Sequence, residues 1–147
     1  MPLSATSAPA AGVDQHSALI IVDVQNCFVT GGSLAVDGGE TIIPLINRLA
    51  ARFSNLILTQ DWHPAQHISF AAQHPGKQPG EFIDTTYGPQ ILWPVHAVQG
   101  TEDAALHPEL QVDHAQLIIR KGCHPHIDSY SAFTEADRQT TTGLAAY

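Results

Sequence analysis

The chain has 147 residues, of which 44% are hydrophobic and 14% are charged, a composition typical of one globular domain and not of a disordered chain. Acidic residues outnumber basic ones by 14 to 6, so the surface should repel nucleic-acid backbones, and we expect no nucleic-acid partner. No apolar run approaches the roughly 20 residues of a membrane span, and the cysteine usage favours a reducing, cytoplasmic location.

The first predicted elements are an N-terminal extension, a strand and a helix. Residues 1–17 are rich in Ala, Ser and Pro and carry no Lys or Arg, so we predict a loose extension and not a secretory signal, with the folded domain over 18–147. The mostly apolar residues 18–24 predict a central strand buried on both faces. Residues 39–53 have apolar side chains at helical spacing, with Pro44 near the start, where proline is best tolerated, and predict a helix.

Two more strands and a long irregular stretch follow. We predict a second buried strand over 55–61 and a third over 115–120, with a helix beginning at 141–147. Residues 62–114 show no periodicity and many Pro and Gly residues, which predicts a functional loop region. This order indicates an α/β fold with a parallel sheet flanked by helices. Three strands would leave open sheet edges, so we expect the domain of 18–147 to be incomplete at its C-terminus.

Charged residues follow each predicted strand: Asp23, Asp61 and Lys121. The carboxyl ends of parallel strands line one crevice, where ligands bind in open α/β sheets. The three side chains are therefore candidates for a common site. The alternative is that each only marks where a strand emerges into water.

A metal site is predicted from the spacing of one carboxylate and three imidazoles. Asp61 and His63 are two positions apart in an extended segment and point to the same side. Pro64 then turns the chain and returns His67, and a later loop supplies His96. These ligands suit one divalent Zn²⁺, Fe²⁺ or Mn²⁺ ion and suit Ca²⁺ or Mg²⁺ poorly.

Several motifs follow one another along the chain, in residues 23–28, 31–36, 59–70, 93–101, 120–122 and 128–133. In sequence and order they resemble those of nicotinamidases, which are isochorismatase-like cysteine hydrolases with a Rossmann-like three-layer fold. The resemblance includes the metal-binding segment, which distinguishes nicotinamidases from the metal-free isochorismatases of the superfamily.

The resemblance implies hydrolysis of a small amide, nicotinamide, to nicotinate and ammonia in NAD salvage, with pyrazinamide as an analogue. Asp23 matches the catalytic aspartate that carries the proton, and Lys121 matches the lysine that favours a thiolate. The metal would hold the pyridine nitrogen and orient the substrate. Phe28 and Trp93 match aromatics that flank the ring, and Tyr130 is a further pocket candidate. The alternative for these aromatics is ordinary core packing.

One catalytic part of the family is missing from these 147 residues. The nucleophilic cysteine of the family lies after residues 128–133, beyond a further helix and strand, and no cysteine stands there. Cys27 is interpreted as a loop variant, and Cys123 is a weak substitute near Lys121. We therefore expect the N-terminal two-thirds of a nicotinamidase. Two alternatives stay open: a metal-binding fragment without turnover, and a related hydrolase acting on another small amide or an isochorismate-like ether. The oligomeric state is not predicted.

Overall fold

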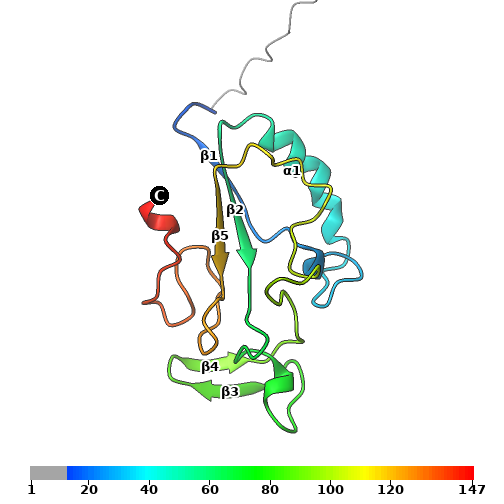
Figure 1. The fold of residues 1–147 in the computed structure, drawn as a ribbon, viewed down its shortest axis with the longest axis vertical. Coiled ribbons are helices and arrows are strands. Elements are labelled where there is room, and N and C mark those ends of the chain that lie inside the picture. Colours follow the sequence, from blue (N-terminus) through cyan, green and yellow to red (C-terminus); the bar gives the residue numbers. More distant parts are fainter. Residues whose placement is uncertain (1–12) are drawn as a thin grey trace, which may run out of the picture.

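A three-stranded parallel sheet organises the structure, a computed structural model that describes residues 13–147 (Figure 1). Its strands are β1 (Ala18–Ile21), β2 (Asn55–Asp61) and β5 (Leu117–Lys121), in the order β1-β2-β5. β2 pairs in parallel with both neighbours. The predicted α/β fold with a parallel sheet is thereby confirmed.

The predicted helix over 39–53 is present in a shorter form. It begins as a 3-10 turn, η2 (Gly39–Ile42), and continues as α1 (Ile43–Ala50), with Pro44 in the first turn as expected. α1 packs its apolar side against β1 and β2, where each fully buried aliphatic side chain contributes about 1.5–3 kcal/mol. The buried residues of this cluster are Ile21, Val24, Ile43, Ala50, Leu56 and Leu58.

The prediction for the first strand is wrong in two respects. β1 ends at Ile21 and not at Val24, and it lies at an edge of the described sheet instead of its centre. Ile20 is 37% exposed and Val22 is 56% exposed, whereas six of the seven residues of β2 are buried. All four residues of β1 are apolar, but only three of the seven residues of β2 are, so the burial of β2 follows from its two neighbours in the sheet and not from its composition.

The predicted irregular region 62–114 contains a β-hairpin that the sequence did not indicate. β3 (Phe82–Thr85) and β4 (Gly88–Ile91) pair antiparallel and form a separate sheet, far from α1 in Figure 1. Each strand has only four residues, and Gly88 and Pro89 in β4 interrupt the alternation of apolar and polar residues by which a strand is recognised in a sequence. β4 carries Gln90, which is buried beside the candidate site.

The remaining elements are short. The 3-10 turns are η1 (Asn26–Phe28), η3 (Ala71–Gln73) and η4 (Leu144–Ala146). η4 stands where the opening of a helix was predicted over 141–147, so that prediction is correct in place but not in helix type.

The predicted N-terminal extension falls mostly outside the described residues, which start at 13. The part that is described contacts the domain, because the Asn55 side-chain amide donates hydrogen bonds to the carbonyls of Gln15 and Ser17. Whether 1–17 is loose stays a prediction.

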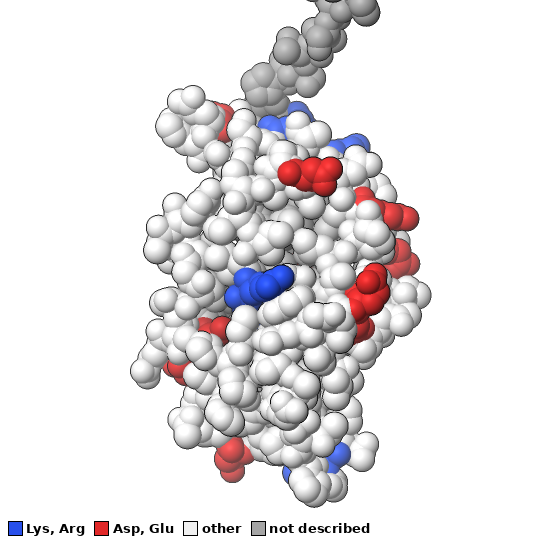
Figure 2. Space-filling model, in the orientation of Figure 1, with Lys and Arg blue, Asp and Glu red and all other residues white. Residues whose placement is uncertain are grey.

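The surface charge and the length of the helices relate to the earlier expectations about nucleic acid and membranes. In Figure 2 acidic side chains are most numerous on the right of the visible face, with others at its left and lower end, and basic side chains occupy small separate areas. This distribution accompanies the formal net charge of -8. Within residues 13–147 no helix has the length and apolar character needed to cross a membrane.

Candidate functional site

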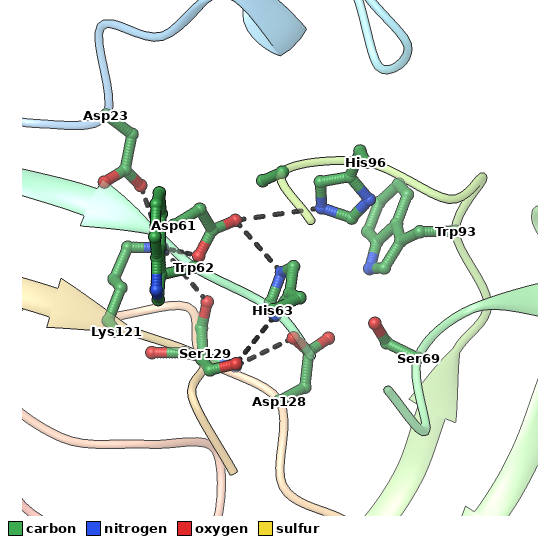
Figure 3. Close-up of polar contacts among 12 residues, drawn as sticks. Asp23, Asp61, Trp62, His63, Ser69, Trp93, His96, Lys121, Asp128 and Ser129 are labelled. Carbon is green, nitrogen blue, oxygen red and sulfur yellow. Dashed lines mark hydrogen bonds and ion pairs between the residues drawn. The ribbon is translucent and has the colours of Figure 1, made fainter. Parts of the chain in front are cut away.

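Lys121 joins the two carboxylates that the strand ends were expected to bring together (Figure 3). Its Nζ lies 2.8 Å from Asp23 Oδ2 and 2.6 Å from Asp61 Oδ1. The contact follows from sheet register, because Asp61 at the end of β2 lies opposite Lys121 at the end of β5. The structure thus places all three residues in one site, and their roles in chemistry stay predictions.

The charges of this trio stabilise one another. Burial alone would lower the pKa of Lys121, but the negative charges of Asp61 and Asp23 outweigh it and raise that pKa. Burial would likewise raise the pKa of Asp61, but hydrogen bonds with His63 and His96 and the charge of Lys121 lower it. Both groups are therefore ionised near neutral pH. Removing one partner of such a buried pair costs about 3–5 kcal/mol.

Asp23 is held in an unusual backbone conformation. Its φ of 51° lies in the left-handed region, which costs a non-glycine residue about 1–3 kcal/mol and is characteristic of functional sites. Thr59, fully buried in β2, supports it twice. The Thr59 hydroxyl donates to Asp23 Oδ1 at 2.6 Å and accepts from the Asp23 backbone N–H at 3.1 Å. Sequence reasoning missed Thr59, because only the packing of β1 against β2 reveals it.

Asp61, His63 and His96 form a compact group of possible metal ligands. Asp61 Oδ2 lies 3.3 Å from His63 Nε2 and 3.7 Å from His96 Nε2 (Figure 3). The other ring nitrogens face backbone carbonyls: His63 Nδ1 is 2.9 Å from the Gly122 oxygen, and His96 Nδ1 is 2.8 Å from the Pro94 oxygen. A carbonyl oxygen only accepts, so each Nδ1 carries a proton. The hydrogen bond to the carbonyl orients the ring, as such bonds behind metal-binding histidines commonly do.

His67 lies in a second, overlapping group. Its ligand atoms cluster with those of His63 and Asp128, and not with those of Asp61 and His96. Its Nε2 donates to the Ile127 carbonyl at 3.1 Å, and its Nδ1 accepts from the Ser69 hydroxyl at 2.7 Å. Burial, together with the charge of His63, lowers the pKa of His67 to about 4, so its imidazole is neutral. The four predicted ligands are therefore neighbours, but their ligand atoms do not all lie within 4.8 Å of one another.

The donor set fits a divalent transition-metal ion. It offers a carboxylate and imidazoles, which suit Zn²⁺, Fe²⁺ or Mn²⁺. All four predicted ligands are buried. Among the described residues, every buried side-chain nitrogen and oxygen already has a hydrogen-bond partner, so an ion would replace hydrogen bonds within the group and would not fill an unsatisfied vacancy.

Two further residues position the ligands and were not found from sequence. Gln25, fully buried, donates to the Asp61 carbonyl at 2.9 Å and accepts from the Asp61 N–H at 2.7 Å. Gly122 has a φ of +65°, and a Cβ there would overlap the His63 ring, lying 2.6 Å from Nδ1. A glycine directly after a predicted strand-end lysine is the signal that could have indicated this close approach.

The three predicted aromatic residues lie on two sides of the site. Phe28 lines a cavity of about 150 Å³ that also includes Asp23, and its ring centroid is 5.9 Å from that of His96. Trp93 Nε1 donates to the Tyr130 hydroxyl at 3.1 Å, which links these two on the hairpin side. A larger hollow of about 910 Å³ is lined by Tyr130 but by none of the four predicted metal ligands.

Neither cysteine has the environment of an activated thiol. Cys27 is fully buried, and burial together with the charges of Asp103 and Asp61 raises its pKa to about 12. Cys123 is exposed, and burial of part of its side chain and the charge of Glu135 raise its pKa as well. A catalytic thiol requires the opposite shift.

Residues 17–142 match the isochorismatase domain family, and the chain belongs to that family. The resemblance to its nicotinamidases is confirmed over these residues. The chain is 64% identical over 132 residues to a nicotinamidase from Acinetobacter baylyi, a match that covers 90% of this chain and 62% of that protein. The chain therefore spans about 62% of the length of this curated relative.

Solved structures show the same fold. The nicotinamidase/pyrazinamidase of Acinetobacter baumanii is 64% identical with a TM-score of 0.89, covering 91% of this chain and 65% of that one. A yeast nicotinamidase bound to the inhibitor nicotinaldehyde is 34% identical with a TM-score of 0.80, covering 88% and 68%. A Pyrococcus horikoshii pyrazinamidase in complex with zinc is 33% identical with a TM-score of 0.62, covering 88% and 61%.

Proposed function

We propose that these 147 residues form the metal-binding and proton-transferring part of a nicotinamidase, which hydrolyses nicotinamide to nicotinate and ammonia. The observation that carries the proposal is the Lys121 ammonium, which contacts Asp23 and Asp61 at once. Through it, the predicted catalytic aspartate adjoins the predicted metal ligands. The names of the similar proteins support the same activity, and cytoplasmic NAD salvage stays a prediction.

The residues have distinct roles in this proposal. Asp23, held by Thr59 and facing Lys121, would take the proton of the attacking thiol and pass it to the leaving amine. Lys121 would keep Asp23 oriented and favour the thiolate by its positive charge. Asp61, His63, His67 and His96 would hold a divalent ion. When bound, that ion would supply a positive centre for the pyridine nitrogen of the substrate.

The aromatic residues would complete the substrate pocket. Phe28 adjoins Asp23 along the small cavity, so a ring bound there would lie beside the proton carrier. Trp93 would cover the ring from the loop that also carries His96, with its indole N–H held by Tyr130. The binding of nicotinaldehyde by the yeast nicotinamidase supports a small pyridine compound as the ligand.

We also propose that neither Cys27 nor Cys123 is the nucleophile and that polypeptide outside residues 1–147 supplies it. The raised pKa values of both thiols and the burial of Cys27 support this. The 147 residues alone should then bind a divalent metal without releasing ammonia, which is the binding-module alternative.

Ammonia release by the product of the complete coding sequence tests the proposal. We expect release from nicotinamide and pyrazinamide, and Lys121→Met should lower the rate by about 100-fold or more, within the range of lost acid–base catalysis. Lys77→Met, at a partly exposed lysine that pairs with Glu81 away from the site, is the matched control and should leave the rate unchanged. A full-length protein that binds metal but releases no ammonia would contradict the amidase assignment. A panel of other small amides and an isochorismate-like ether separates the related-hydrolase alternative.

A further inference from the structure

Asp128 is a buried carboxylate without a cationic partner. The residue is only 3% exposed. Oδ1 accepts from the Ser129 N–H at 2.8 Å, and Oδ2 accepts from Gln90 Nε2 at 2.7 Å. Within residues 13–147 it forms no ion pair with Lys, Arg or His. Neutral donors compensate a buried negative charge only in part, so such a group calls for a positive charge nearby.

The neighbours of Asp128 are two of the predicted metal ligands. Ligand atoms of Asp128, His63 and His67 all lie within 4.8 Å of one another. Among the described residues, the Asp128 carboxylate forms no hydrogen bond with either histidine. Ligand atoms about 2.1 Å from one ion lie up to about 4.2 Å apart, so the 4.8 Å limit is close to the spread of a metal site. Figure 3 shows Asp128 near His63, on the side of His63 that faces away from Asp23.

Gln90 fixes the direction of this carboxylate. It comes from β4, in the hairpin that the sequence did not indicate, and is 1% exposed. Its Nε2 also lies 2.7 Å from the Tyr130 hydroxyl, so one amide connects Asp128 to the predicted substrate side. A rigid, buried amide of this kind holds a charged group in one orientation.

Charge balance points the same way. The formal charges of Asp23, Asp61 and Lys121 sum to -1, so a dication in the site would leave one excess positive charge. The formal charge of Asp128 would balance it. A buried site is most stable when its charges compensate, because the low dielectric strengthens every unbalanced interaction.

We propose that Asp128 is a second carboxylate of the cation site, directed at the ion from the side of His63 and His67 and setting its affinity. The inference rests on the proposed metal site. It explains why His67 clusters with Asp128 and not with Asp61, since the ion would then have ligands from two overlapping groups.

Zn²⁺ affinity of the metal-stripped protein, measured by competition with a chromogenic chelator, tests this. Asp128→Asn should weaken Zn²⁺ binding about 10- to 100-fold, the usual effect of removing a group that supports a metal site. Asp113→Asn, at an exposed aspartate, should bind as the wild type does. Wild-type protein without Zn²⁺ affinity would overturn the metal site itself. Wild-type affinity retained in Asp128→Asn would overturn only the role of Asp128.

Two further variants separate charge from structure. Asp128→Glu keeps the charge and should bind Zn²⁺ more tightly than Asp128→Asn, and equal losses in both would overturn the proposal. Should Asp128→Asn not fold, Asp128→Ser takes its place with the same expectation. In excess chelator, Asp128→Asn removes an uncompensated charge but also one hydrogen-bond acceptor, because Nδ2 of Asn cannot accept from Ser129 or Gln90, so its melting temperature there measures the structural contribution alone. A lower melting temperature with unchanged Zn²⁺ affinity would assign Asp128 a purely structural role.

Discussion

Gly122→Ala should weaken metal binding in addition to destabilising the fold. A Cβ at Gly122 would overlap the ring of His63 and lie 2.6 Å from its Nδ1. The ring must then move, and its 2.9 Å hydrogen bond to the Gly122 carbonyl is lost or distorted, at a cost of about 1 kcal/mol. The φ of +65° adds about 1–2 kcal/mol of backbone strain for any residue with a Cβ.

The strain and the displacement of His63 can be measured separately. Gly76 has a φ of +79° and no atom within 4 Å of a Cβ, so Gly76→Ala carries the strain alone. In urea unfolding with chelator present, Gly76→Ala should lose about 1–2 kcal/mol and Gly122→Ala about 2–3 kcal/mol, because Gly122→Ala also loses the hydrogen bond of His63. Only Gly122→Ala should also lose about 10-fold or more in Zn²⁺ affinity, equal to about 1.4 kcal/mol. Equal Zn²⁺ affinities in the two alanine variants would refute the reasoning.

Two other predictions follow from buried groups. Thr59→Val should lower the free energy of unfolding by about 2 kcal/mol in urea titrations, because the Asp23 carboxylate and N–H lose their hydrogen-bond partner. A loss below about 0.5 kcal/mol would show that Thr59 does not support Asp23 in this way. Ellman's reagent should modify exposed Cys123 in the native protein and Cys27 only after denaturation. Because the pKa of Cys123 is raised, its rate should climb about tenfold per pH unit from pH 7 to 9, and a plateau below pH 7 would reveal an activated thiolate instead.

The residues at the sheet edge could be predicted because topology alone brings them together. Apolar runs identified three parallel strands, and the carboxyl ends of such strands meet at one edge. The contacts of Lys121 with Asp23 and Asp61 agree with this rule. The family was recognised from motif order, which needs no knowledge of packing.

The rest of the site depends on tertiary packing that no local pattern reports. Spacing indicated four metal ligands but not that His67 turns toward Asp128. Gln90 was hidden in a four-residue strand beside Gly and Pro, and Thr59 reads as an ordinary strand residue. Apolar composition also misassigned β1 as central, since it reports burial on average and not which strand has two neighbours.

Metal content of the purified protein tests the central claim most directly. We predict one divalent transition-metal ion per chain, and loss of that ion in both His63→Ala and His96→Ala. His126→Ala, at an exposed histidine, should retain it. Equal metal content in the wild type and all three variants would contradict the site.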